Sequence, residues 1–301
     1  MSEFIQKVPM FKGASLDFWN PTHINYFINR IKNKESFSII RFNLDAWTLF
    51  ITAFNNMGFK SWPKNNINNN FLKKLGVSTA KALEVRNKTN GMNYIITAEN
   101  FEGILKMIVN PKPKNFHLSV SDRTYYYGSY PIPNGKPWVA NLIKQMCPPG
   151  EIPFNSLVWK TWAMNGQIHK LFTDLKEYEI VLIGPHYLSK LPNIVKNNKI
   201  KHIKIHETNA SINIEKQIKK LISLHEKLQN GDKKIIYICE GGAPVNWLIY
   251  RLHGKLKNAY MLDVGRSLDI YFYNDPIRKK TPHWQWGGWV EPNPPTWMNK
   301  I

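Results

Sequence analysis

Small and polar residues that could hold an anion follow two apolar runs of the sequence. The turn "GPHYL" follows residues 180–183, and the turn "EGGAP" follows residues 234–239. Glycine lets a phosphate approach the backbone closely, and the free N–H groups at the start of a following helix attract negative charge. Neither turn has the spacing of a Walker A loop or of GxGxxG, so an ordinary tight turn is an equal alternative. The candidate binding residues in these turns are Gly184, His186, Gly241 and Gly242.

A third apolar run, residues 260–264, leads into "DVGRSLD", which carries three ionisable side chains. We expect Arg266 to balance the charge of a diphosphate, and Asp263 or Asp269 to bind a hydroxyl or to act as a base. The letters "LDVG" also resemble the first motif of nucleotide-cofactor methyltransferases. The glycines that would let that cofactor lie against the backbone are absent, which disfavours a methyltransferase.

The remaining residue types give no support to several common kinds of site. The nine histidines include no HExxH pair, the two cysteines form no CxxC, and the sequence contains no GxSxG elbow. A structural zinc, a disulfide framework and an α/β-hydrolase triad are therefore not indicated.

Short apolar, β-branched runs bounded by turn residues must position these side chains. Several are apolar on both faces, which is typical of buried parallel strands. In the last third of the chain, two amphipathic helical patterns alternate with strands in the order β-α-β-α-β. The sequence predicts an α/β fold with a Rossmann-like, doubly wound, mostly parallel sheet and helices on both faces. The predicted strands are residues 37–42, 94–97, 116–120, 180–183, 202–205, 234–239 and 260–264.

Two segments lack a regular pattern. Residues 123–153 are rich in proline and glycine and form either a linker or a functional loop. The tail, residues 275–301, is rich in tryptophan, and Trp284 and Trp286 suit either a stacking platform for sugar rings or bases or a packed C-terminal lid. We expect both segments to belong to a single domain that spans residues 1–301.

The charge of the chain favours anionic partners. Its 41 Lys and Arg against 21 Asp and Glu give a net charge of +20, which attracts nucleotide phosphates, nucleic acid or a membrane surface. AT-rich coding that enriches lysine explains the same excess equally well. The N-terminus has no signal-peptide core and no run is long enough to span a bilayer, so we expect a soluble, cytoplasmic protein.

The order of the motifs resembles that of the D-type-fold (Rossmann-like) glycosyltransferases. That family shows an RYGDGEW-like turn, a VGP-x-HL strand and turn, a small-residue turn ending in Gly-Pro, and a last strand reading DvG-x-x-x-D. The corresponding stretches here are "FSIIRFNLDAW", "EIVLIGPHYLSKL", "IYICEGGAPVNW" and "YMLDVGRSLDIYF". The likeness covers about residues 37–45 and, more firmly, residues 178–272.

This resemblance implies that a sugar is transferred from a nucleoside-diphosphate sugar to a glycan hydroxyl, with inversion at the anomeric carbon. Such a reaction needs a base for the acceptor proton and an electropositive site for the leaving diphosphate. The residues that match the family motifs by position are Arg41, Asn43, Gly184, His186, Gly242, Asp263 and Asp269.

The sequence departs from the family at the first turn. The D-x-E pair that holds a divalent metal in the family falls on Leu44 and Ala46, and neither side chain can bind a cation. Asp45 remains, but it is shifted by one residue from the family's position. On a strand, a shift of one residue turns the side chain to the opposite face. Either a bulge brings Asp45 into place, or the chain works without that metal, or catalysis has been lost. A divalent ion, Mn or Mg, stays an open alternative as cofactor.

The first hypothesis is therefore a glycosyltransferase that works without the usual metal pair, with Lys and Arg holding the diphosphate. Asp45 and Asp269 are its candidate bases. The residues expected at the donor site are Arg41, His186, Gly241, Gly242, Asp263, Arg266 and Asp269, and Asn43, Gly184, Trp284 and Trp286 are further candidates for substrate binding. The alternative is a non-catalytic Rossmann-like module that binds nucleic acid or glycan through a basic, Trp-rich surface.

Overall fold

The computed structural model describes residues 5–9, 15–42, 103, 106–107, 110, 112–120, 143–205, 213–229, 233–272 and 295–300. The strands of these residues form one sheet in the order β1-β2-β5-β4-β3-β9-β8-β6-β7. All neighbouring strands pair in parallel except β1 and β2, which are antiparallel. The strands are β1 Ile5–Pro9, β2 Ser15–Trp19, β3 Ser38–Phe42, β4 Phe116–Val120, β5 Phe154–Asn155, β6 Glu179–Gly184, β7 Lys201–Lys204, β8 Ile235–Cys239 and β9 Ala259–Asp263.

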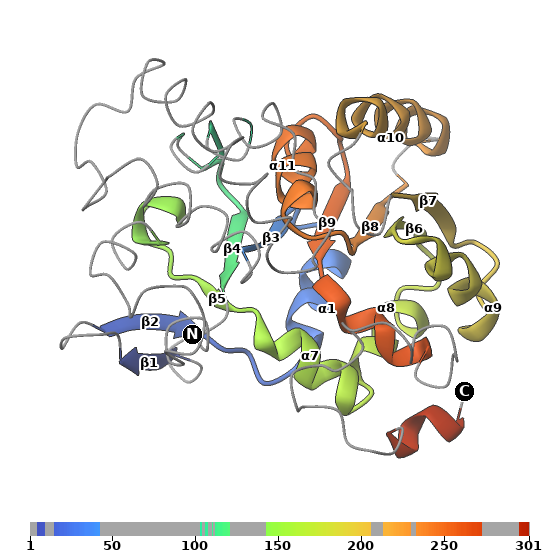
Figure 1. Ribbon diagram of the computed structural model, residues 1–301, viewed down its shortest axis with the longest axis horizontal. Helices are drawn as coiled ribbons and strands as arrows, with labels where there is room; N and C mark the ends of the chain where they lie inside the picture. The colour runs from blue at the N-terminus through green and yellow to red at the C-terminus, as the bar shows by residue number, and fades with distance from the viewer. Residues whose placement is uncertain are drawn as a thin grey trace, which may run out of the picture.

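Helices cover both faces of this sheet, which confirms the predicted doubly wound α/β fold. Figure 1 shows α10 and α11 on one side of the strands and α1, α7 and α8 on the other. The helical segments are α1 Asn25–Lys32, α7 Leu157–Met164, η3 Gln167–His169, α8 Lys170–Thr173, η4 His186–Lys190, α9 Leu191–Ile194, α10 Ile214–Leu228, α11 Ala243–Leu252, η5 Gly265–Phe272 and η6 Thr296–Lys300.

Each face of the sheet has its own apolar core because alternate residues of a strand point to opposite sides. In β8, for example, Tyr237 packs with α10 and α11, whereas Ile236 and Ile238 pack with α1, α7 and η5. All five residues of β8 are buried, as are all five of β9. These central strands are therefore covered from both sides, as their unbroken apolar sequences predict.

The two helices predicted in the last third are present. Ile214, Ile218 and Leu221 of α10 are buried on one stripe, and α11 buries most of its length against β3. The chain leaves α11 through Gly254, whose φ of +75° lies in the left-handed region that glycine favours. The glycine expected to end α10, Gly231, lies outside the described residues.

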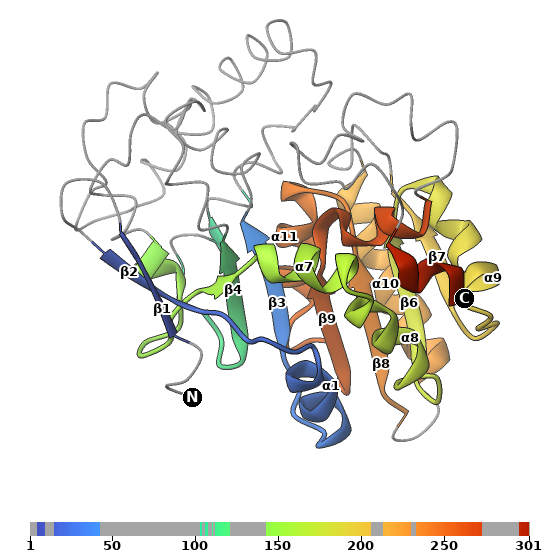
Figure 2. The same cartoon turned by 90° about the horizontal axis from the view of Figure 1, so that it is seen from below.

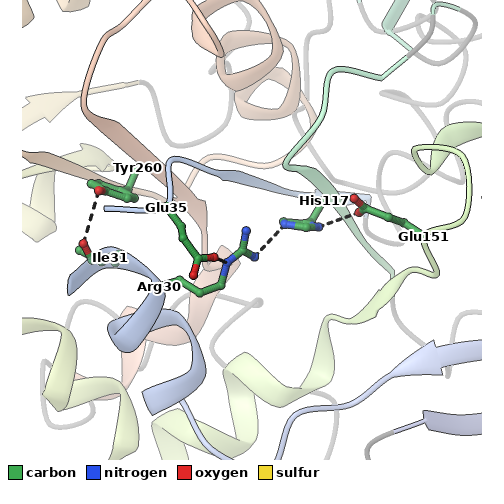
Figure 3. A network of polar contacts seen from close by, with 6 residues as sticks. All are labelled: Arg30, Ile31, Glu35, His117, Glu151 and Tyr260. Carbon is green, nitrogen blue, oxygen red and sulfur yellow. Dashed lines mark hydrogen bonds and ion pairs between the residues drawn. The ribbon is translucent and has the colours of Figure 1, made fainter. Parts of the chain in front are cut away.

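A polar network joins α1 to the amino end of β4, on the edge of the sheet opposite the candidate site (Figure 3). Arg30 donates to Glu35 and to His117 Nε2, both at 2.9 Å, and its guanidinium lies 4.4 Å from the Phe37 ring centroid. Because Arg30 can only donate, His117 Nε2 accepts, and Nδ1 carries the hydrogen that bonds Glu151 at 2.9 Å. The network satisfies a buried arginine and fastens a helix to the sheet.

Five of the predicted strands correspond to β3, β6, β7, β8 and β9 within a residue or two, and residues 116–120 coincide with β4. The predicted strand at residues 94–97 lies outside the described residues. So do residues 121–142, which include most of the proline- and glycine-rich segment, and residues 273–294 of the tail. Both cysteines are buried and free, and no helix of the described part of the chain is long and apolar enough to cross a membrane.

Candidate functional site

The candidate site lies at the carboxyl end of the sheet, where the direction of winding changes. From β3 the chain proceeds to β4 and β5 on one side, and it returns through β6, β7 and β8 to β9 on the other. Figure 2 shows β4, β3, β9 and β8 side by side, with α1 toward the amino ends of these strands, away from the candidate site. In open parallel sheets, ligands bind outside the carboxyl ends of strands at such a switch point.

The ladder between β3 and β9 stops before the strands end. The paired residues are Ser38 with Met261 and Ile39 with Leu262. Beyond them, the side chain of Asn246 on α11 takes the place of a strand neighbour for Arg41. Its Oδ1 accepts from Arg41 N at 3.1 Å, and its Nδ2 donates to Arg41 O at 3.0 Å. The fully buried amide thus holds the end of β3 against α11.

Asp263, the last residue of β9, links the ends of the same two strands. One carboxyl oxygen accepts from Gly265 N at 2.9 Å and the other from Arg41 N at 3.2 Å. Burial raises the pKa of Asp263 to about 7, although the Arg41 charge and the two backbone N–H groups lower it. The carboxyl group therefore changes its protonation state near neutral pH.

The guanidinium of Arg41 lies directly over Gly265. A Cβ atom on Gly265 would fall 1.4 Å from Arg41 Nη1 and 2.5 Å from its Cζ. Gly265 also has a φ of +54°, in the left-handed region where a side chain is strained. A side chain at this position would therefore be strained, and it would also displace the Arg41 guanidinium.

A second cluster lies beside the first, in η5 and the neighbouring strand ends. Arg266 Nε and Nη2 both bond Asp269 Oδ2, at 2.7 and 2.6 Å. The other oxygen of Asp269 lies 2.6 Å from the Tyr187 hydroxyl, which also contacts Glu240 Oε1. Asp269 is fully buried while the Arg266 side chain is 38% exposed, so the carboxylate anchors an arginine that reaches toward solvent.

The charge of Arg266 is fixed by these neighbours. Burial tends to lower the pKa of Arg266, but the carboxyl groups of Asp269 and Glu240 and the Tyr187 hydroxyl raise it by more. The net shift is upward, so the guanidinium stays charged at any pH at which the protein is folded.

The turn "EGGAP" forms the entrance to α11, as predicted. Gly242 has φ +68° and ψ −158°, a conformation open essentially to glycine alone, and nothing lies within 4 Å of a Cβ placed there. Gly241 is needed for a different reason, because its Cβ would fall 2.1 Å from Ile205. Pro244 follows in the first turn of the ten-residue helix. The N-terminal end of α11 therefore lies beside the carboxyl end of β8, and no described residue comes within 4 Å of a Cβ placed on Gly242.

The turn "GPHYL" is placed next to this region, but its histidine points elsewhere. A Cβ on Gly184 would meet Leu188 at 2.4 Å and the Glu240 carbonyl oxygen at 3.0 Å, so this glycine serves close packing between two turns. His186 is exposed at the start of η4. The next residue, Tyr187, is the one that points inward, into the cluster with Glu240 and Asp269.

The structure thus brings together six of the predicted site residues at one edge of the sheet. They are Arg41, Gly241, Gly242, Asp263, Arg266 and Asp269. Gly184 and His186 flank them, and Asn43, Asp45, Trp284 and Trp286 lie outside the described residues. Whether any of them binds a donor stays a prediction.

The sequence patterns did not single out three residues that the structure places in the site: Tyr187, Glu240 and Asn246. Each lies next to, or four residues after, a glycine or histidine that was selected. Their polar side chains sit in stretches that are otherwise apolar or small. The signal available in the sequence was a single polar residue within an apolar stretch beside a predicted strand end, since such a residue is expected to be buried.

Metal ligands do not gather in the part of the chain described. Among those residues, no group of three or more His, Cys, Asp or Glu side chains is arranged to hold a metal ion. Within the described residues, the partly exposed Arg266 interacts with Glu240, which precedes α11, and Arg41 lies half-buried over Gly265. This arrangement suits an anion, since arginine forks and free N–H groups both donate.

Comparisons with known proteins return few likenesses. No protein-family model matches the chain, and no curated protein matches its sequence. The chain is similar to a solved structure of the domain of unknown function 1792, which has a distinct glycosyltransferase fold. That likeness has 15% identity and a TM-score of 0.39 and covers 82% of this chain and 78% of that one.

A second similar structure is a glycosyltransferase (DUF1792) from Streptococcus sanguinis. The identity is 15% and the TM-score 0.44, over 85% of this chain and 84% of that one. Likenesses at this level do not identify an activity, so the fold class rests on the order and direction of the strands.

Proposed function

We propose that this chain is a glycosyltransferase that takes a sugar from a nucleoside-diphosphate sugar and attaches it, with inversion, to a hydroxyl of a glycan. One observation carries the proposal: the Arg41 guanidinium lies over Gly265, and Arg266 is the next residue of the chain, at the switch point of a doubly wound sheet. The motif order that resembles the D-type-fold family supports it.

The two arginines suit the leaving diphosphate. Each is held by a buried carboxyl group, Arg266 by Asp269 directly and Arg41 through its backbone by Asp263. Fixed donors cost little reorganisation when negative charge develops on a leaving group. The N-terminal end of α11 adds N–H groups on the same edge. These donors would take over the role of a divalent ion, with Mn or Mg kept as the alternative.

The catalytic base is assigned between two aspartates. Asp269 is fully buried, and both of its oxygens are engaged, by Arg266 and by Tyr187. A general base must be within hydrogen-bond reach of the proton that it removes, so Asp269 suits the placement of Arg266 better than proton abstraction. Asp45, which lies outside the described residues, is the base that the proposal retains.

Binding of nucleoside diphosphates tests the proposal most directly. Titration calorimetry with UDP, GDP and ADP, with and without manganese, should reveal saturable binding by at least one of them. Arg41→Gln and Arg266→Gln should each weaken that binding about 10- to 100-fold, since a hydrogen bond to a charged group contributes about 1.5–3 kcal/mol.

Arg251→Gln is the matched control. Arg251 lies on α11 and pairs with Glu215 at 2.8 Å, away from the strand ends. Its replacement should leave the affinity within a factor of about two. The proposal is refuted if no nucleoside diphosphate binds, and metal independence is refuted if binding needs manganese.

The net charge of +20 favours one further candidate, a non-catalytic module that binds nucleic acid or glycan. Nucleic-acid affinity falls steeply as salt rises, because neutralised phosphates release counterions. A steep salt dependence with RNA or DNA, together with no response to any nucleoside diphosphate, would support that candidate.

A further inference from the structure

The indole of Trp297, in η6, occupies a slot made by the end of α7 and the turn that follows it. Its Nε1 donates to the carbonyl oxygens of Ala163 and Met164, both at 3.1 Å. The last four carbonyls of an α-helix have no partner within the helix, so a donor from elsewhere in the chain stabilises this end. A Cβ on Gly166, which has a φ of +79°, would fall 2.8 Å from Trp297 Cγ. The glycine therefore lets the indole lie directly against the backbone.

The same indole contacts η5, the segment that carries Arg266. Its ring centroid lies 5.6 Å from that of Tyr271, with the two ring planes 81° apart. His169 lies beside both rings, with its centroid 6.0 Å from that of Trp297 and its Nδ1 3.0 Å from the Tyr271 hydroxyl. Tyr271 is 6% exposed, so its ring is enclosed by these neighbours. The last residues of the described chain thus pack against the C-terminal half of η5.

The segment η5 depends on such contacts because its own backbone hydrogen bonding is weak. It is a 3₁₀-helix of eight residues, whereas 3₁₀ runs longer than about four residues are uncommon since their hydrogen-bond geometry is poor. Its backbone is also non-helical at Arg266, with φ −82° and ψ 21°. At the start of the segment, the Asp263 carboxyl group accepts from Gly265 N at 2.9 Å. Toward its end, Tyr271 packs against Trp297. Side chains outside η5 therefore hold it in place.

We propose that Trp297 is a positioning residue for Arg266: seated in its slot on α7, the indole fixes η5 through Tyr271, and so fixes the direction in which the guanidinium meets an anion. Asp269 lies two residues before Tyr271, and its Oδ2 bonds Arg266 Nε at 2.7 Å and Nη2 at 2.6 Å. A displacement of Tyr271 is thereby passed to the arginine. Donors favour an anion most when they are already held in place. Loss of the indole therefore weakens anion binding although Trp297 itself contacts no ligand.

This inference rests on the proposed function for its ligand, a nucleoside diphosphate, but the position of Arg266 can be observed without any ligand. The NMR signal of the Arg266 Nε–H group, assigned by its loss in Arg266→Gln, reports the bond to Asp269. We expect this signal to move in Trp297→Ala. It should move less in Trp297→Phe, which keeps a ring against Tyr271. A signal at the wild-type position in Trp297→Ala overturns the inference.

The coupling to the site is tested by the affinity for UDP. Trp297→Ala should weaken binding about tenfold, the contribution of one hydrogen bond to a charged group, and Trp297→Phe should weaken it less.

Trp19→Ala is the matched control. Trp19 is also half-buried and packs against aromatic rings, with its centroid 4.4 Å from that of Tyr26. It belongs to β2, which β5 and β4 separate from the strands of the candidate site. Its replacement should lower Tm and leave the affinity for UDP within a factor of about two, since distant sites act independently. An equal loss of affinity in Trp19→Ala and Trp297→Ala would reflect general destabilisation and would overturn the inference.

A double-mutant cycle separates positioning from a purely structural role. If Trp297 acts through Arg266, Trp297→Ala should cause little further loss of UDP affinity in the Arg266→Gln variant, so the two effects are not additive. Additive losses overturn the inference. If no nucleoside diphosphate binds the wild type but the Arg266 signal moves in Trp297→Ala, the proposed function fails and the positioning role stands. If UDP binds wild type and Trp297→Ala equally well, the positioning role fails and the proposed function stands.

Discussion

Replacing Gly265 by alanine should damage the candidate site in a way that can be separated from backbone strain. The added Cβ would meet Arg41 Nη1 at 1.4 Å, so the guanidinium must leave its position. The backbone also stays at a φ of +54°, which costs an L-residue about 1–2 kcal/mol. At about 2.1 cal/mol/K of unfolding entropy per residue, the 301 residues of the chain convert this cost into a fall in Tm of about 2–3 °C.

Gly254→Ala is the matched control for the free-energy cost of a positive φ alone. Gly254 has a φ of +75° at the end of α11, and nothing lies within 4 Å of a Cβ placed there. Its replacement should lower Tm by a similar amount, about 2–3 °C. Gly265→Ala should lower Tm further, because Arg41 moves away from the buried carboxyl group of Asp263, whose pKa the arginine holds down.

Differential scanning calorimetry and titration with UDP measure the two effects. Gly265→Ala should weaken UDP binding about tenfold or more, the contribution of one charged hydrogen bond, whereas Gly254→Ala should not change it. Equal Tm values and equal affinities for the two variants would refute the placement of Arg41 over Gly265. A loss of affinity in Gly254→Ala would show that the test lacks specificity for the site.

Three further predictions concern stability. Burial raises the pKa of Asp263 from 3.8 to about 7, so between these values the folded chain holds a proton that the unfolded chain releases. This contribution to stability is present at acid pH and is lost as pH rises through about 7. The difference in unfolding free energy between wild type and Asp263→Asn, measured by urea titration, should therefore fall as pH rises from 3.8 to about 7. Asn246→Ala should lower the unfolding free energy by about 1–3 kcal/mol with an unchanged m-value, since the buried carbonyl of Arg41 loses its donor. Burial lowers the pKa of His225, whose ring bonds the Tyr237 hydroxyl at 2.9 Å. The contribution of His225 to stability is therefore present above its ordinary pKa of 6.5 and is lost at lower pH. His225→Gln should reduce the fall of Tm on acidification, and the same dependence of Tm on pH in the variant and the wild type would contradict this.

The sequence determined the central part of the fold because its signals there are local. Unbroken β-branched runs such as β8 can be covered only from both sides, and the 3.6-residue stripe of α10 needs no partner to be recognised. The short elements gave weaker signals. β5 has two residues, and β2 joins it through a single residue pair, so their existence depends on the neighbouring strands and not on propensity.

For the candidate site, the sequence showed where the strands end, because turn residues follow them. It therefore showed which turns carry glycine, arginine and aspartate. Only the tertiary structure decided how they combine. It brings the Arg41 guanidinium over Gly265, 224 residues further along the chain, and turns Tyr187 inward where the sequence had favoured His186. It also gives Asn246 the place of a missing strand neighbour. These contacts join segments distant in the chain, and no local pattern of residues records which side chain will fill the space where two strands separate.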